Sequence, residues 1–409
     1  MLASRVMTLE KTDFYPDLFS AGDKIYFDHN ATAPLCRKIV SSAPELLEAF
    51  GNPSSIHQFG RRPKKIIRDA RNQFAKFIDC HPLELIFTSG GSESNSLVLK
   101  SEFLRAKKAG IKNPHFVVSK IEHPASIKSI EQLKELGLKV SWIEVDRNGQ
   151  VDFSQYQSLF QEPVHLVSCM LANNETGCIL PIKEMCQFAK SQGAKFHTDA
   201  VQALGKMEFS LKELDVDYAS FAGHKFYAMK GVGALFSKQG NVIENLISGG
   251  GQERSRRGGT ENTLGIASMG IVAEFFPQQK SYIEYVRTLR DSLEEKLVSR
   301  ISNLEILGRE TNRVCNTSSV FIQGVDGESL LMNLDLAGIA VSTGAACSSG
   351  NPEPSPVLIA MGLSHAEAQS SMRVSLGWGS TMAEVDRFIE ELEKVVIRLR
   401  AIKENGGEL

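Results

Sequence analysis

Two short segments carry residues that could act together on one small molecule. Residues 196–202 read FHTDAVQ and contain Asp199, and residues 222–225 read AGHK and end in Lys225. Each segment follows an apolar run typical of a β-strand, so the two side chains can meet at one edge of a sheet. A lysine amine can form a Schiff base with an aldehyde, and a carboxylate can keep a pyridine nitrogen protonated. The pair therefore indicates pyridoxal phosphate chemistry.

Taken singly, the two residues have simpler interpretations. A lone lysine is most often a solvated surface residue, and an aspartate at a strand end is usually a helix cap. The surrounding sequence argues against both. Seven segments resemble, in order, those of the cysteine desulfurases, which belong to the class V aminotransferases of fold type I. These segments are residues 26–32 (YFDHNAT), 51–57 (GNPSSIH), 87–95 (FTSGGSESN), 122–125 (EHPA), 173–177 (NNETG), 249–254 (GGGQER) and 373–377 (RVSLG).

The phosphate of the cofactor has an expected place near residue 91. Gly91 and Ser92 follow a predicted strand and open a predicted helix, so free backbone N–H groups and the positive end of the helix dipole would face an anion there. The resemblance implies further contacts from His224 and from a hydroxyl at position 222. This chain has Ala222 instead, so one phosphate hydrogen bond should be missing or replaced.

The resemblance also assigns roles around the ring of pyridoxal 5′-phosphate. Gln202 is expected to contact the phenolic oxygen, and Asn174 to lie near the ring and the substrate carboxylate, which Arg373 would bind in a bidentate pair. His123 is expected to stack on the ring and to act as acid or base, a task that its ordinary pKa of about 6.5 would suit. Thr260 would reach the phosphate of the opposite subunit, which implies an obligate homodimer with shared sites.

Cys347 points to the reaction. It lies in residues 341–354 (VSTGAACSSGNPEP), which are too rich in Gly, Ser and Pro for a helix or a central strand. Most free cysteines are buried and inert, but one among small polar residues in a loop can be an exposed nucleophile. The stretch resembles the longer active-site loop of one cysteine desulfurase subgroup. That resemblance implies conversion of L-cysteine to L-alanine, with a persulfide left on Cys347.

Some alternatives remain open at this point. A selenocysteine lyase or another class V aminotransferase-like enzyme would share every cofactor residue, and a catalytically silent paralogue could serve as a sulfur-assembly scaffold. The scaffold alternative is disfavoured because it needs none of Lys225, Asp199, His123 and Cys347. The protein that receives the sulfur, an iron–sulfur scaffold or a tRNA-thiolation relay, is not specified.

The elements that must position these residues alternate along the chain. Apolar runs near residues 84–87, 115–118, 139–143, 164–168 and 195–197 alternate with stretches of helical period, which predicts a mostly parallel sheet, of the seven-stranded type, covered by helices on both faces. Residues 30–279 are expected to form this large cofactor-binding domain. Residues 280–409 are expected to form a smaller α+β domain, joined by residues 1–29, with amphipathic helices after 280 and after a Thr381–Glu384 capping box.

Composition is that of an ordinary globular enzyme. The chain has 409 residues, a formal net charge of −2 and 42% hydrophobic residues, with no cationic cluster and no apolar run long enough to span a membrane. We therefore expect neither a nucleic acid nor a membrane partner. Seven cysteines without a C-x-x-C pair, and a polar beginning unlike a signal peptide, predict free thiols and a cytoplasmic location.

Overall fold

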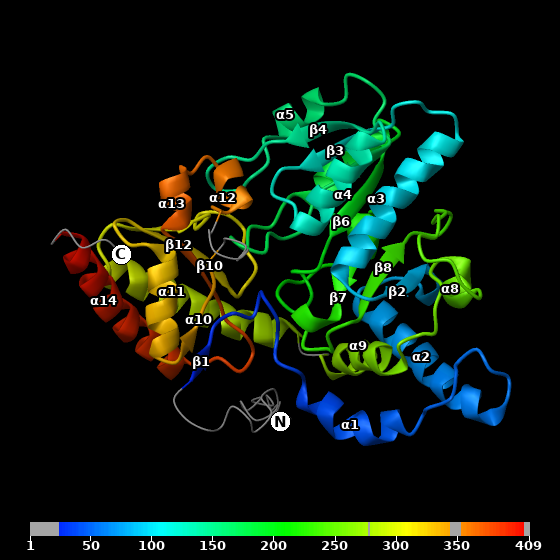
Figure 1. Cartoon of the computed structure of the whole chain (residues 1–409), viewed down its shortest axis with the longest axis horizontal. Coiled ribbons are helices and arrows are strands. Elements are labelled where there is room, and N and C mark those ends of the chain that lie inside the picture. Colours follow the sequence, from blue (N-terminus) through cyan, green and yellow to red (C-terminus); the bar gives the residue numbers. More distant parts are fainter. Residues whose placement is uncertain (1–23, 277–278, 344–352, 405–409) are drawn as a thin grey trace, which may run out of the picture.

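A seven-stranded sheet forms the centre of the larger part of the protein (Figure 1). The computed structural model describes residues 24–276, 279–343 and 353–404. The strand order is β2-β8-β7-β6-β5-β3-β4, and β8 alone runs against the other six. The strands are β2 (Leu85–Thr88), β3 (His115–Ser119), β4 (Lys139–Ile143), β5 (Leu166–Ser168), β6 (Lys195–Asp199), β7 (Tyr218–Ala222) and β8 (Gly233–Ser237). The predicted mostly parallel sheet is confirmed.

Both faces of this sheet are largely buried, except at the edge strand β4, which explains why its inner strands are rich in apolar residues. Alternate residues point to opposite faces, so Ile86 and Phe116 pack on one side while Phe87 and Val117 pack on the other. One face is covered by α3 (Gly91–Lys108) and α4 (Pro124–Glu135). The opposite face is covered by α2 (Gln58–Phe77), α6 (Ile182–Ser191) and α9 (Thr263–Phe275).

The chain positions Asp199 and Lys225 through one crossover connection. Strands β6 and β7 lie side by side and parallel, with Asp199 opposite Ser220. The crossover contains the short helix α7 (Leu211–Leu214). After β7 the chain enters a 3-10 turn, η4 (Gly223–Lys225), at the same edge of the sheet. The two residues that first indicated a site therefore end neighbouring strands at their carboxyl ends, as the sequence predicted.

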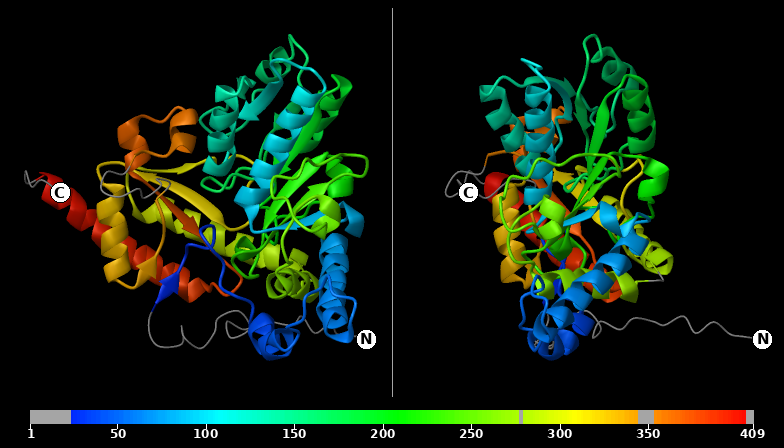
Figure 2. Two further views of the ribbon diagram at one scale, coloured as in Figure 1. Left: turned by 45° about the vertical axis from the view of Figure 1, so that its right-hand side comes forward. Right: turned by 90° about the vertical axis from the view of Figure 1, so that its right-hand side faces the viewer.

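A second, antiparallel sheet forms the core of the smaller part. Its order is β12-β10-β9, built from β9 (Leu304–Leu307), β10 (Thr317–Ile322) and β12 (Ser371–Ser375). Around it lie α10 (Gln279–Arg300), α11 (Gly327–Leu336) and α14 (Met382–Glu404), as two views in Figure 2 show. The apolar positions predicted for α10 and α14 are buried. The predicted capping box is present, because the Thr381 hydroxyl accepts from the Glu384 N–H (3.3 Å) while the Glu384 carboxylate accepts from the Thr381 N–H (2.9 Å).

The first described residues pack against the smaller part. Strand β1 (Ile25–Tyr26) pairs in parallel with β11 (Ile339–Ala340), and Asp28 forms a bridge with Ser375. The boundaries proposed for the two domains remain a prediction. The remaining elements are α1 (Arg37–Leu47), η3 (Pro82–Glu84), α5 (Phe153–Ser158), α8 (Gln252–Ser255), α12 (Pro356–Ala360) and α13 (His365–Gln369). Among the described helices, none is both long and apolar enough to cross a membrane.

Candidate active site

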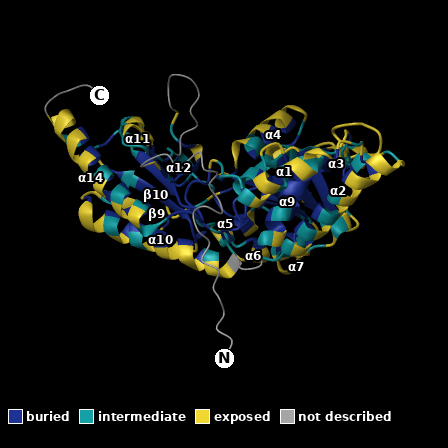
Figure 3. Ribbon diagram, turned by 90° about the horizontal axis from the view of Figure 1, so that it is seen from below, coloured by how far each residue is buried: buried dark blue, intermediate teal, exposed yellow. Residues whose placement is uncertain are grey.

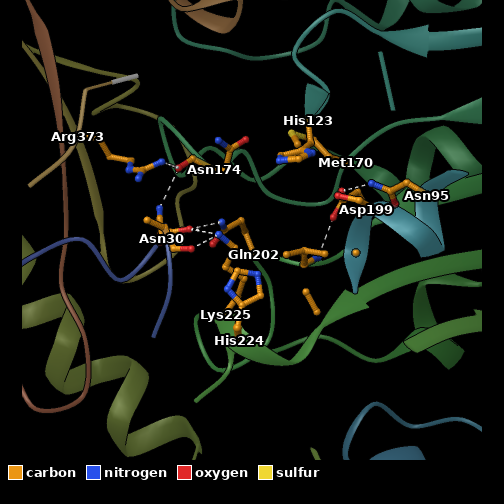
Figure 4. A pocket seen from close by; sticks show the side chains of 15 residues that line it. Asn30, Asn95, His123, Met170, Asn174, Asp199, Gln202, His224, Lys225 and Arg373 are labelled. Atoms are coloured by element: carbon orange, nitrogen blue, oxygen red, sulfur yellow. Dashed lines mark hydrogen bonds between the residues drawn. The ribbon is translucent and has the colours of Figure 1, made fainter. Parts of the chain in front are cut away.

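A cavity of about 310 Å³ opens at the carboxyl ends of the parallel strands (Figure 4). Of the eleven residues that the sequence predicted for the site, nine line this cavity. They are Gly91, Ser92, His123, Asn174, Asp199, Gln202, His224, Lys225 and Arg373. They come from regions of the chain as far apart as α3 and β12, so the fold brings together what the sequence only suggested.

Two neighbours hold the Asp199 carboxylate in place. One oxygen accepts from the Asn95 side-chain N–H (2.6 Å) and the other from the Val201 backbone N–H (2.9 Å). Sequence reasoning did not assign Asn95. It stands four residues after Gly91 on α3, one helical turn further along, and that spacing is the signal that could have placed it on the same face. With two donors fixed, Asp199 presents a carboxylate of defined orientation to the cavity.

The Lys225 amine lies across the cavity and is easily deprotonated. It donates to the backbone carbonyls of Asn30 (2.7 Å) and Ala31. Burial and, next, the nearby Arg373 cation lower its pKa, the carboxylates of Asp28 and Asp199 oppose the shift, and the net result is a pKa of about 8. A substantial fraction of neutral, nucleophilic amine therefore exists near neutral pH.

His123 begins α4 and is neutral near pH 7. Its Nδ1 accepts a hydrogen bond from the Ala125 backbone N–H (3.1 Å), so the neutral ring carries its proton on Nε2. Desolvation by the surrounding protein lowers its pKa below the ordinary value, Asp199 opposes this shift and Lys225 adds to it. The ordinary pKa of about 6.5 expected for His123 from the sequence is therefore wrong, because the cavity wall excludes the water that would solvate the imidazolium.

Arg373 extends from β12 of the smaller sheet and is not the surface residue that its type alone suggests. One terminal nitrogen pairs with Asp28 (2.8 Å), and the other donates to the backbone carbonyl of Asn174 (3.1 Å). Its Nε and the Asn174 Oδ1 are both buried without a hydrogen-bond partner among the described residues. Buried polar groups are normally satisfied, so these atoms indicate a ligand with its own polar groups.

The opposite end of the cavity has the features of an anion site. Helix α3 begins after Gly90 without a side-chain cap, which leaves its first N–H groups for a ligand. A Cβ on Gly91 would lie 2.8 Å from a Val201 methyl carbon, so no side chain fits between helix and wall. His224 contacts the Thr32 hydroxyl through Nδ1 (3.2 Å), and Ala222 lines the wall where a hydroxyl was expected.

Two predicted residues lie apart from this cavity. Thr260 is exposed in the segment between α8 and α9 and does not line the cavity of its own chain. Cys347 falls in residues 344–352, outside the described residues. Of the other six cysteines, predicted to be structural, five are buried and Cys80 is partly buried.

Comparisons with known proteins agree with this geometry. The class V aminotransferase family profile matches residues 25–388. The chain belongs to the class V aminotransferases.

Cysteine desulfurase 2 of Trichormus variabilis is 40% identical over 379 residues, 92% of this chain and 94% of that protein. Cysteine desulfurase IscS of Dictyoglomus turgidum is 41% identical over 381 residues, 93% and 96% of the two chains. A solved NifS-like protein superposes with a TM-score of 0.85 at 33% identity, covering 92% of this chain and all of the other.

Class V aminotransferases of this kind depend on pyridoxal 5′-phosphate, and the cavity fits that group. The N-terminus of α3 has no side-chain cap and can bind a phosphate through its free N–H groups. The Asp199 carboxylate can pair with a protonated pyridine nitrogen, and the Lys225 amine can react with an aldehyde. The unpartnered Asn174 Oδ1 and Arg373 Nε offer polar contacts to an amino acid bound beside it. The expected cofactor and the expected fold type are therefore confirmed at the level of the family.

The lowered pKa of Lys225 predicts how the protein without cofactor takes it up. Only the neutral amine attacks an aldehyde, so the rate should rise with pH up to about 8 and level off above 9. Mixing the apoprotein with pyridoxal phosphate between pH 6 and 10 and following absorbance would measure this. Arg373→Met should move the midpoint upward, because it removes a nearby positive charge. A rate that keeps rising through pH 10 would contradict the assignment.

The hydroxyl missing at position 222 predicts a gain on restoring it. Ala222→Ser should tighten cofactor binding about fivefold, the effect of roughly 1 kcal/mol from one net hydrogen bond. The dissociation constant can be measured by absorbance after equilibrium dialysis. Ala219→Ser is a matched control, since position 219 lies on the opposite face of β7 and should leave affinity unchanged. Equal affinity for Ala222→Ser and the parent would mean that another group already fills the gap.

Proposed function

We propose that this chain is a pyridoxal phosphate-dependent cysteine desulfurase that converts L-cysteine to L-alanine and keeps the sulfur on Cys347 as a persulfide. The observation that carries the proposal is the meeting of Asp199, Lys225 and Arg373 around one cavity. The first two suit the cofactor and the third suits an amino acid carboxylate. Relatives named cysteine desulfurase, aligned over more than nine-tenths of the chain, support the choice of reaction.

The residues present divide into those that hold the cofactor and those that act on the substrate. Gly91, Ser92 and His224 would hold the phosphate, Asp199 the ring nitrogen, and Gln202 the phenolic oxygen. When bound, pyridoxal phosphate supplies an aldehyde that captures the substrate amine and a protonated ring that withdraws electrons from Cα. Asp199 would keep that ring protonated, because hydrogen bonds from two donors hold its carboxylate in a defined orientation.

Arg373 orients the substrate, and Lys225 and His123 move protons. Arg373 binds the substrate carboxylate, with the Asp28 pair holding the guanidinium in position. The Lys225 amine would take the substrate's Cα proton at Nζ, a task for which a pKa of about 8 suits it. Neutral His123 would donate its Nε2 proton on the cavity side and could take a proton back there afterwards, since its Nδ1 is engaged by the Ala125 N–H at the start of α4.

The sulfur itself passes to Cys347. Its thiolate forms a bond with the substrate sulfur while the bond between that sulfur and Cβ breaks, and the electron pair and a proton go to Cβ. The products are L-alanine and a Cys347 persulfide, so no external oxidant or reductant is needed. The persulfide would then pass to a scaffold for iron–sulfur clusters or to a tRNA-thiolation relay, in the reducing cytoplasm that free thiols suit.

The proposal includes a homodimer with shared sites. Large apolar side chains are exposed around the start of α2, with Phe50 79%, Ile56 93% and Phe59 55% exposed; Figure 3 shows exposed positions along α1 and α2. A surface hollow nearby is lined by Pro53 and Ser54 together with residues 250–254 and Glu261. Glu261 directly follows Thr260 in the chain. A partner that covers the apolar residues would thus meet the segment that carries Thr260, as expected if Thr260 serves the partner's phosphate.

The reaction can be tested by separating cofactor chemistry from sulfur transfer. Cys347→Ala should still give spectral changes of the bound cofactor with L-cysteine, because the cavity is intact, but should lose alanine formation and the persulfide. Cys80→Ala, at a partly buried position elsewhere, is the matched control and should retain both. Mass spectrometry after incubation with L-cysteine locates the added sulfur. Alanine released at the parental rate by Cys347→Ala would favour a lyase, and selenide release from L-selenocysteine alone would favour a selenocysteine lyase.

The shared site can be tested with two substitutions. Ile56→Asp should shift the protein toward monomer in sedimentation velocity and weaken cofactor retention, because a charge would be buried in the interface. Thr260→Ala should leave the dimer intact and weaken cofactor retention about fivefold, the effect expected from the loss of one hydrogen bond. Leu336→Asp, on an equally exposed leucine of α11, is the control that should change neither. A monomeric parent with full cofactor would rule out the shared site.

A further inference from the structure

A buried lysine lies directly behind the wall of the cavity. Lys206 is 6% exposed and does not line the cavity itself. It stands four residues after Gln202, in the turn that follows β6. Its Nζ donates to the side-chain oxygen of Asn30 (2.9 Å) and to that of Gln202. Neither the sequence motifs nor the proposed mechanism gives this residue a task.

These bonds fix the orientation of the Gln202 amide. A primary amide has an acceptor side and a donor side, so engaging its oxygen decides where its N–H₂ group points. With Oε1 toward Lys206, the Gln202 Nε2 donates one hydrogen to the Asn30 carbonyl (3.2 Å) and keeps the other for the cavity that Gln202 lines. Without Lys206 the amide could turn over and present an oxygen instead.

The same lysine orients Asn30. Its side-chain oxygen accepts from Lys206 and from Asn316 (3.1 Å), so its N–H₂ group points the other way. That group donates to the Asn174 carbonyl (3.0 Å) and to the Thr317 hydroxyl (2.8 Å). Figure 4 shows Asn30 between Gln202 and Asn174, with hydrogen bonds to each.

Lys206 therefore belongs to a hydrogen-bond network that extends through Asn30 to Lys225 on one side of the cavity and to Asn174 on the other. The Asn30 carbonyl also accepts from Lys225 (2.7 Å), and the Asn174 carbonyl accepts from Arg373 (3.1 Å). The Lys206 backbone is itself held by the Cys315 N–H (3.1 Å). Burial, with the nearby Lys225 cation, lowers the pKa of Lys206 well below its usual range. The neutral amine still has two N–H donors, enough for the two amide oxygens.

We propose that Lys206 is a positioning residue that holds the Gln202 amide with its N–H toward the phenolic oxygen of the cofactor. The proposal rests on the cofactor contact proposed for Gln202. It does not make Lys206 a catalytic residue, since Lys206 acts through Gln202 and Asn30. A buried lysine that only joined the two parts of the fold would affect stability and leave the cofactor contact unchanged.

A double-mutant cycle on cofactor binding separates these two possibilities. Lys206→Met and Gln202→Leu should each weaken the dissociation constant for pyridoxal phosphate about fivefold, the scale of one hydrogen bond. If Lys206 acts through Gln202, the double variant should bind no more weakly than Gln202→Leu alone. The absorption maximum of the bound cofactor should shift in the same direction in all three. Titration of each full-length apoprotein with pyridoxal phosphate gives both quantities.

Two further variants serve as controls. Lys195→Met removes a lysine at the start of β6, where its ammonium pairs with Glu102 (3.1 Å) far from any cofactor contact, and should leave affinity and spectrum unchanged. Lys206→Gln keeps a donor at a buried position and should recover part of the lost affinity, which also guards against a Lys206→Met protein that does not fold.

The outcomes are distinguishable. Additive losses in the double variant, or Lys206→Met with parental affinity and spectrum, would overturn the positioning role while leaving the proposed function intact. An unchanged Gln202→Leu would remove the proposed cofactor contact of Gln202, and the inference with it. Loss of thermal stability in Lys206→Met without any change in cofactor spectrum would assign Lys206 to the fold alone.

Discussion

The parallel pairing of β6 with β7 is the constraint on which the site depends. Its register sets Asp199 opposite Ser220 and delivers the chain to the η4 turn at the same edge, so that Lys225 meets Asp199 across the cavity. Because side chains alternate along a strand, a slip of one residue would turn Asp199 to the opposite face of the sheet. The apolar residues on both faces prevent that slip, since each must stay in its own core.

The other wall of the cavity depends on a different sheet. Arg373 belongs to the antiparallel β12 and reaches the cavity only because Asp28 and the Asn174 carbonyl hold its guanidinium. Asp28 lies next to β1, which itself pairs with β11. The substrate end of the site is therefore assembled from three distant parts of the chain. Packing of the larger and smaller parts around one shared core, more than any local motif, sets the distance between the cofactor groups and the group that would bind the substrate carboxylate.

Sequence alone predicted six of the seven strands of the larger sheet, all but β8, and most of the residues that line the cavity; the omissions have physical causes. Buried strands are recognised as short apolar runs, and amphipathic helices by apolar residues that recur every three to four positions. Neither pattern indicates the direction of a strand, so the antiparallel orientation of β8 could not be predicted. Asn30, Asn95 and Lys206 were missed since their roles arise from hydrogen bonds between segments 104 to 176 positions apart. The shifted pKa of His123 follows from desolvation, which exists only once the cavity has formed.

The charge balance of the cavity explains why an anionic cofactor suits it. Lys225, His224 and Lys206 all have lowered pKa values, each first because of burial and then because of neighbouring cations. Burying these groups together disfavours their charged forms, although the Asp28 and Asp199 carboxylates partly offset this effect at Lys225. A phosphate at the start of α3 and a substrate carboxylate at Arg373, the contacts proposed above, would add negative charge and so favour the protonated forms of these groups. By linkage, a ligand that binds only the folded chain stabilises it, and a ligand in this cavity would contact both sheets, since Asp199 of β6 and Arg373 of β12 line it.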